Sequence, residues 1–264
     1  MSDSSHPAVS ELARLLGVPP SAADSADRAE TIYRELRSQR PRLRPGNFSS
    51  LSAADVEAAV TGYDDVYFRG AVRRALGESP LTFRVSSRMT SSGGTTTRRQ
   101  RRSSTGELGV ARYEIAVSST LLLNSFQGEA AAEPLVLSGI PCVDRVQGLQ
   151  RVVEHELVHL IELLVWGKSN CRGGRYQGVA ESWFRHTEHS HRLVTPRERA
   201  ATEFGIRVGS LVSFAHQGRR YEGRVNRVTR RATVLVEDPN GEPYSNGRSY
   251  SKFYVPLEAL EPLG

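Results

Sequence analysis

The pentapeptide His155-Glu156-Leu157-Val158-His159 lies within an apolar run, residues 149–165, whose spacing predicts a helix. On a helix, residues i and i+4 lie one turn apart on the same face, so His155 and His159 can present two imidazole nitrogens to one ion. Glu156 follows the first histidine directly and can reach a metal-bound water. This arrangement is the one that a zinc hydrolase requires, with an open coordination position beside a carboxylate base.

The flanks of the pentapeptide are apolar on most sides of the predicted helix, so both histidines are expected in a packed interior. The flanking residues are Leu149, Val152, Val153, Leu157, Val158, Leu160, Ile161, Leu163 and Leu164. Because a five-residue pattern also occurs by chance, the alternative is a buried helix with two hydrogen-bonded histidines and no metal. Glu154 and Glu162 lie on the same helix, where they either orient histidine N–H groups or occupy surface positions.

A catalytic zinc site usually takes a third protein ligand. The downstream candidates are His186, His189 and His191, and spacing alone does not choose among them. Cys171 lies close to the motif in sequence. A thiolate can bind zinc, but we expect Cys171 to be a buried thiol.

Three further segments precede the pentapeptide in an ordered series. Residues 63–70 resemble the pattern Y-D-x-x-F-F-x-G, and residues 83–90 followed by Gly93-Gly94 resemble W-S-x-R-M-T-x-x-x-G. Residues 114–118 with Leu121-Leu122 resemble a strand I-x-L-S and the L-L after it. Over about residues 47–195 the chain therefore resembles the SprT-like (Spartan-type) zinc metallopeptidases.

The resemblance implies a Zn²⁺-dependent endopeptidase with Glu156 as the general base and His155 and His159 as ligands. In the family the third ligand is the histidine of a G-H-G-x-x-F motif, and His186 within residues 185–189 is its best counterpart. Both glycines and the phenylalanine of that motif are replaced, so His189 and His191 remain alternatives. The family also suggests a protein substrate that is bound or crosslinked to DNA.

The 264-residue chain is expected to fold as α+β with several parts. Ser52 and Asp55 are typical of a helix start, and a second helix is expected over residues 66–76. Alternating residues predict strands at 81–85 and 113–117, and a loop at 127–133 and a helix at 176–184 are expected on either side of the histidine motif. We predict an N-terminal helical arm over residues 1–46 and a minimal zincin-like metallopeptidase domain over residues 47–200. The pattern of residues 205–264 indicates about five short strands, separated by Gly and Asn-Gly turns. This pattern predicts a small SH3-like or KOW-like β-barrel.

The formal net charge of +6 favours anionic partners. Two arginine-rich segments are candidates for binding DNA or RNA: the loop from Arg98 to Arg102, and the second strand of the predicted barrel. The barrel arginines are Arg219, Arg220, Arg224, Arg227, Arg230 and Arg231, interleaved with the aromatic residues Tyr221, Tyr250, Phe253 and Tyr254.

These charges support an alternative function, a nucleic-acid-binding protein whose zinc is structural and not catalytic. A third hypothesis is a metal hydrolase with a non-protein substrate, for which nothing in the sequence indicates a small-molecule pocket.

Membrane insertion is not expected, because no apolar run approaches the roughly 20 residues that span a bilayer. The first residues show no basic segment followed by an apolar one, so no signal peptide is expected. Cys142 and Cys171 are the only cysteines, too few for a disulfide framework. The expected location is the cytoplasm, where the protein could associate with the nucleoid.

Overall fold

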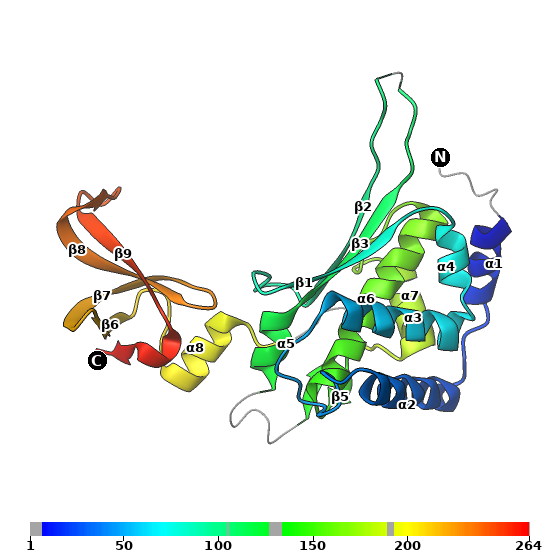
Figure 1. Ribbon diagram of the computed structural model, residues 1–264, viewed down its shortest axis with the longest axis horizontal. Helices are drawn as coiled ribbons and strands as arrows, with labels where there is room; N and C mark the ends of the chain where they lie inside the picture. Colours follow the sequence, from blue (N-terminus) through cyan, green and yellow to red (C-terminus); the bar gives the residue numbers. More distant parts are fainter. Residues whose placement is uncertain (1–6, 105, 127–133, 189–192, 264) are drawn as a thin grey trace. The chain divides into compact units, whose positions relative to one another are not determined.

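The computed structural model describes residues 7–104, 106–126, 134–188 and 193–263 (Figure 1). The chain is a mixed α+β protein that divides into two compact units, Met1–Leu193 and Val194–Gly264. Each unit is described here by itself.

The N-terminal segment belongs to the core of the first unit. Helices α1 (Pro7–Leu16) and α2 (Ala22–Gln39) bury one face each, and Leu12 and Ile32 lie fully inside the main hydrophobic cluster. Ser21 begins α2 by accepting a hydrogen bond from the Asp24 backbone N–H at 3.1 Å. The expected separate arm over residues 1–46 is therefore wrong, because its apolar stripes pack against the helices that follow.

Helices α3 (Ala53–Phe68) and α4 (Ala71–Leu76) follow. Ser52 and Asp55 form the reciprocal capping box that the sequence predicts at the start of α3. The expected helix over residues 66–76 is interrupted, because Arg69 and Gly70 both adopt positive φ, 53° and 74°.

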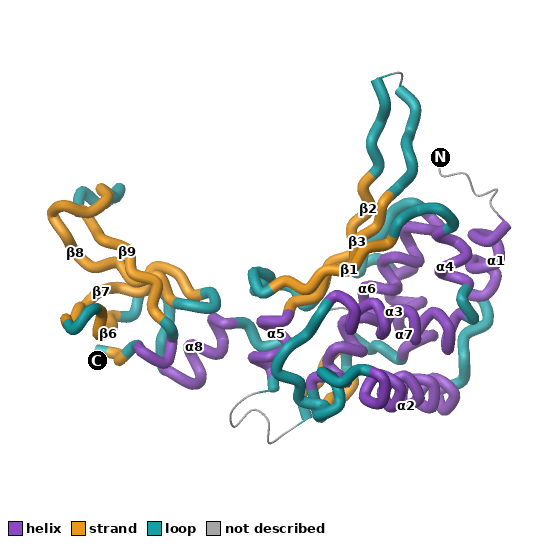
Figure 2. Tube along the Cα trace, viewed as in Figure 1, coloured by secondary structure: helices purple, strands orange, loops and turns teal. Residues whose placement is uncertain are grey.

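A three-stranded sheet lies beside these helices, with the order β1 (Leu81–Ser86), β3 (Arg112–Ser118), β2 (Gly94–Arg99). β1 pairs with β3 in parallel and β2 pairs with β3 in antiparallel fashion, so β2 is an edge strand. The chain between β2 and β3 forms a hairpin that projects from the sheet (Figure 2). The strands expected near residues 81–85 and 113–117 are confirmed.

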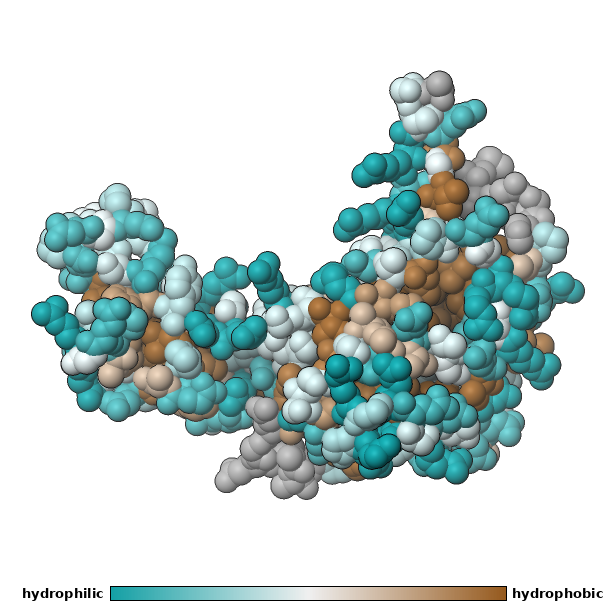
Figure 3. Space-filling model, viewed as in Figure 1, coloured by the Kyte–Doolittle hydropathy of each residue, from teal (hydrophilic) through white to brown (hydrophobic). Residues whose placement is uncertain are grey.

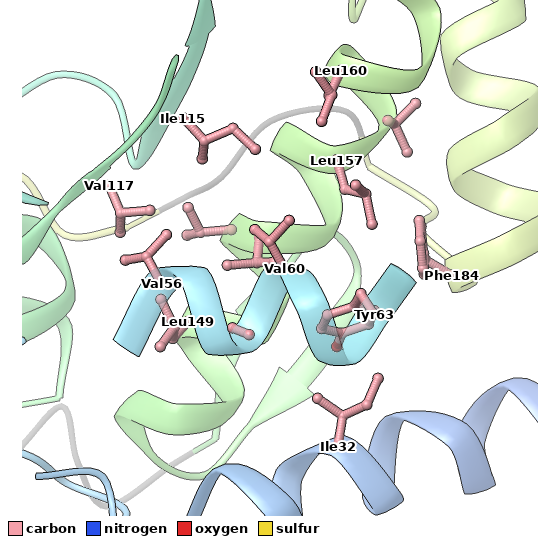
Figure 4. Close-up of a cluster of buried hydrophobic side chains, with 14 of the residues drawn as sticks. Ile32, Val56, Val60, Tyr63, Ile115, Val117, Leu149, Leu157, Leu160 and Phe184 are labelled. Carbon is pink, nitrogen blue, oxygen red and sulfur yellow. The ribbon is translucent and has the colours of Figure 1, made fainter. Parts of the chain in front are cut away.

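Helix α6 (Arg145–Trp166) carries the histidine motif and runs through the core. Its Leu149, Leu157 and Leu160 lie among side chains from α3 and β3 (Figure 4). Asp144 caps its start through the Gln147 N–H, and Gly167 ends it with φ 71°. The apolar run predicts this helix correctly.

Shorter elements flank α6. Helix α5 (Ser119–Ser125) follows β3, and β4 (Leu135–Leu137) and β5 (Ile140–Cys142) form a hairpin before α6. Helix α7 (Gly174–Phe184) covers a further side of α6, close to the helix expected at residues 176–184. The expected loop at residues 127–133 lies outside the described residues.

The second unit begins with α8 (Pro196–Phe204), whose Ala200 is buried in that unit's own core. The domain boundary thus precedes the expected one at about residue 200. The sheet contains β6 (Leu211–His216), β7 (Arg219–Val228), β8 (Ala232–Pro243), β9 (Ser249–Val255) and β10 (Glu261–Pro262), with a short 3-10 helix, η2 (Leu257–Ala259), before β10.

The strand order is β10-β6-β7-β8-β9, and the sheet is open within the described residues. A closed barrel would need the two end strands to pair. Here β10 is only two residues long, and β8 continues through a bulge between Glu237 and Glu242 into a long hairpin with β9. The Asn240-Gly241 pair therefore lies within β8 and is not the expected turn, and the expected closed barrel is an open five-stranded sheet.

Within the described ranges, no helix combines the length and apolar character needed to cross a membrane. On the face seen in Figure 3, apolar side chains gather on the hairpin between β2 and β3 among hydrophilic neighbours. Leu108 and Val110 of this hairpin are exposed.

Candidate metal centre

The two motif histidines meet on one face of α6. Their Nε2 atoms lie 3.1 Å apart, and the His155 ring is buried while His159 is partly open. Two nitrogens held about 2.0 Å from a tetrahedral zinc ion are about 3.3 Å from each other. The separation of the two imidazoles thus fits one edge of a zinc coordination shell.

A hydrogen-bonded chain fixes the orientation of His159. Its Nδ1 lies 2.6 Å from Ser169 Oγ, and Ser169 donates its single proton to Glu162 Oε2, also at 2.6 Å. Ser169 must then accept from His159, which places the imidazole proton on Nδ1 and leaves the Nε2 lone pair facing His155. Burial also lowers the pKa of His159, which favours the neutral ring that a metal ion requires.

Glu162 also secures the loop that follows α6. Besides the Ser169 hydroxyl, its carboxylate accepts hydrogen bonds from the Asn170 backbone N–H at 3.1 Å and from Arg175 Nε at 3.0 Å. The Arg175 guanidinium lies over the Trp166 ring, 4.4 Å from its centroid. Of the two roles open to Glu162 in the sequence, the structure favours orienting a histidine.

Cys171, carried by this loop, is the third potential ligand near the histidine pair. One ligand atom each from His155, His159 and Cys171 lies within 4.8 Å of the other two. Two imidazoles and a thiolate are donors that zinc accepts at catalytic sites, so the residues fit this ion. Sequence reasoning expected a buried thiol here and had no signal for the fold of the loop.

Glu156 lies beside the pair, fully buried against the edge strand β2. Thr96 Oγ1 lies 2.7 Å from Glu156 Oε2 and donates to it, and burial raises the pKa of this carboxyl to about 8. A Cβ added to Gly94 would lie 2.6 Å from Glu156 Oε1. Only glycine at position 94 therefore leaves room for the carboxylate in this position.

An open cleft of about 550 Å³ joins these groups. It is lined by Ser92, Gly94, Thr95, Thr96, Arg98, His155, Glu156, His159, Leu163, Gly167, Ser169 and Cys171. Side chains at consecutive strand positions point to opposite faces of a sheet, yet both Thr95 and Thr96 line the cleft. The cleft therefore follows the edge of β2.

Tyr176 of α7 closes the other side of the histidine pair. Its ring centroid lies 5.0 Å from that of His155 and 4.6 Å from that of His159, and its hydroxyl donates to the His155 carbonyl at 3.1 Å. Sequence reasoning gave this residue no role, since its position beside the motif depends on how α7 folds back.

His186 lies in a different environment. It is buried, and its Nε2 lies 2.7 Å from Glu154 Oε2. Tyr63 donates to Glu154 Oε1 at 2.5 Å, and Arg151 is paired with the same carboxylate at 2.6 Å. Glu154 precedes His155, and its side chain projects from the helix about 100° around the axis from that of His155. His186 therefore lies outside the histidine cluster, although the sequence predicted it to be the third ligand. His189 and His191 lie outside the described residues.

Most arginines of the two arginine-rich segments have no carboxylate partner among the described residues. On the second unit, Arg220 pairs with Glu261, and Arg224 donates to the Gly209 carbonyl at 2.7 Å. On the hairpin, Arg98 donates to Gln100 Oε1 and Arg102 donates to the Gly106 carbonyl. The aromatic residues Tyr221 and Phe253 are partly buried, lie with ring centroids 4.9 Å apart, and pack against the second core.

Comparisons of the chain with protein-family models, with curated proteins and with solved structures give no match.

Proposed function

We propose that this chain is a zinc-dependent metalloendopeptidase of SprT-like type, with its catalytic centre in the first unit. The observation that carries the proposal is the convergence of His155, His159 and Cys171 beside the buried Glu156 in one open cleft. In this proposal residues 1–193 form a minimal zincin-like unit, and residues 194–264 form a separate recruitment unit of SH3-like type.

The protein groups have distinct roles in the proposed reaction. A bound zinc ion would supply Lewis acidity toward the scissile carbonyl and toward a water molecule. Glu156 takes a proton from that water and returns it to the leaving amine, and Thr96 holds its carboxylate in place. Ser169 and Glu162 keep the Nε2 lone pair of His159 directed at the ion.

The shape of the cleft supports a polypeptide substrate. The cleft follows the outer edge of β2, where no other described strand pairs with it. An extended peptide can add to such an edge through backbone hydrogen bonds, which would bring its peptide bonds past Glu156. A thiolate ligand at Cys171 also suits the reducing cytoplasm that we expect for the protein.

Metal content and cleavage of unfolded casein test the proposal together. The purified protein should hold about one zinc ion per chain, and Glu156→Gln should keep the zinc while cleavage falls by at least about 100-fold. Cys171→Ala should lose zinc on dialysis. Retained cleavage by Glu156→Gln would refute the mechanism, and stoichiometric zinc in Cys171→Ala would move the third ligand to His189 or His191.

Nucleic-acid binding is a second candidate function, favoured by the uncompensated arginines of the hairpin between β2 and β3. We expect duplex or single-stranded DNA to bind there, where none of the four arginines pairs with a carboxylate among the described residues, whereas Arg220 of the second unit pairs with Glu261. Replacing Arg101 and Arg102 with Gln should lower the log–log salt slope of binding by about 1.5 to 2, since each phosphate contact contributes roughly 0.7 to 0.9. An unchanged slope would move the contact to Arg219 and Arg227.

If zinc removal unfolds the protein and no polypeptide is cut with or without DNA, the zinc is structural and nucleic-acid binding is the main function.

A further inference from the structure

We infer that the cleft selects polypeptides with an acidic side chain near the scissile bond, and that Arg98 recognises this side chain. The inference rests on the proposed peptidase function and names the substrate class of the same site. It starts from the charges that line the cleft. Among the described residues that line it, Arg98 alone has a permanent positive charge and Glu156 alone is acidic.

Arg98 is held at the cleft without a counter-charge. Its Nη2 donates to Gln100 Oε1 at 2.8 Å, while its Nε is buried and has no hydrogen-bond partner among the described residues. The residue lines the cleft and has no carboxylate partner among the described residues, so its other guanidinium N–H groups can donate to an acceptor on the ligand. Carboxylates are the acceptors that best match the planar guanidinium.

The strand register places Arg98 relative to the reacting groups. Gly94, Thr96 and Arg98 alternate along β2 and share the face that Glu156 approaches. A peptide that adds to the edge of β2 would place one side chain beside Thr96 and the side chain two residues away beside Arg98. An Asp or Glu at that second position meets the guanidinium, whereas Lys at the same position is repelled.

Arg99 provides a matched control on the same strand. It is exposed, does not line the cleft, and follows Arg98 on the opposite face of β2. Charge reversal at Arg98 and at Arg99 changes the net charge of the protein by the same amount. A difference between the two variants therefore reports the local contact and not general attraction between a basic protein and an acidic peptide.

Fluorogenic peptides that differ at the second residue on either side of the cleaved bond test the inference with the zinc-loaded protein. The wild type should cleave an Asp peptide with a kcat/KM about tenfold above that of the Ala peptide, the size of one charge-assisted hydrogen bond, and the Lys peptide should be slowest. Arg98→Glu should reverse this order, and Arg99→Glu should keep it. Equal kcat/KM values for the Asp, Ala and Lys peptides, or equal effects of the two variants, would overturn the inference.

Binding separates this inference from the proposed function. The Glu156→Gln variant should bind labelled Asp peptide more tightly than Lys peptide, and addition of Arg98→Glu should reverse this preference. Asp-selective binding without any cleavage by the wild type would refute the peptidase and leave the recognition intact. A DNA oligonucleotide and unlabelled Asp peptide can each compete with the labelled peptide. If the oligonucleotide displaces the labelled peptide at the lower concentration, Arg98 binds phosphate and the inference is overturned.

Discussion

Ser169 lies between His159 and Glu162 and carries a hydrogen bond to each, at 2.6 Å on both sides. Because Ser169 donates its one proton to Glu162, it must accept a hydrogen bond from His159 Nδ1. This fixes the tautomer of His159 and leaves its Nε2 lone pair facing His155. The second motif histidine is therefore oriented by the loop that also carries Cys171.

Ser169→Ala should weaken zinc binding, because His159 Nδ1 then loses its acceptor and the ring can rotate. Losing such an orienting partner typically costs 10- to 100-fold in metal affinity. Competition against a fluorescent zinc chelator measures the change. Ser182→Ala on α7, whose hydroxyl donates to the Val179 carbonyl, should leave the affinity unchanged.

Gly94→Ala should abolish cleavage while zinc binding persists. The new Cβ would lie 2.6 Å from Glu156 Oε1 and displace the carboxylate, and the three atoms nearest to it all belong to Glu156. Zinc content and casein cleavage are measured on the same sample. Gly178→Ala is the control, since its Cβ would meet nothing within 4 Å inside helix α7. That variant should be active and more stable by about 0.5–1 kcal/mol.

The two cysteines should differ in their reactivity toward iodoacetamide at pH 8. Burial raises the pKa of the Cys142 thiol to about 12, so this thiol stays protonated, whereas Cys171 lines the open cleft. Mass spectrometry of the metal-free protein should find Cys171 modified first, and bound zinc should slow that modification. Equal labelling of Cys171 with and without zinc would argue against its role as a ligand.

His186→Ala should retain zinc and lose stability. The substitution removes a partner from the buried Glu154 carboxylate, which still contacts Tyr63 and Arg151. An unsatisfied buried acceptor costs about 1–3 kcal/mol, which urea unfolding monitored by tryptophan fluorescence can measure. Loss of zinc from this variant without a change in stability would restore His186 as a ligand.

Removal of residues 194–264 should leave a folded, zinc-binding first unit. The two units have separate hydrophobic clusters, and α8 packs with the second. Circular dichroism and zinc content of the truncated protein check this expectation. An unfolded product would show that the units depend on each other.

The sequence by itself determined those elements in which a local pattern specifies a local structure. The apolar run around His155 predicts α6, and Ser52 with Asp55 predicts the start of α3, because helical periodicity and capping depend on residues within a few positions of one another. The alternation in residues 113–117 likewise predicts β3. The pairing of His155 with His159 follows from the helical repeat alone.

Only the tertiary structure decided which distant groups join that pair. Cys171 reaches it because Gly167 ends α6 and Glu162 holds the loop, whereas His186 is directed to Glu154 on another face of the helix. Strand pairing between distant residues also places β2 at the edge of its sheet, beside Glu156. The same kind of pairing leaves the sheet of the second unit open. Sequence spacing does not encode these contacts, because each results from the packing of several elements at once.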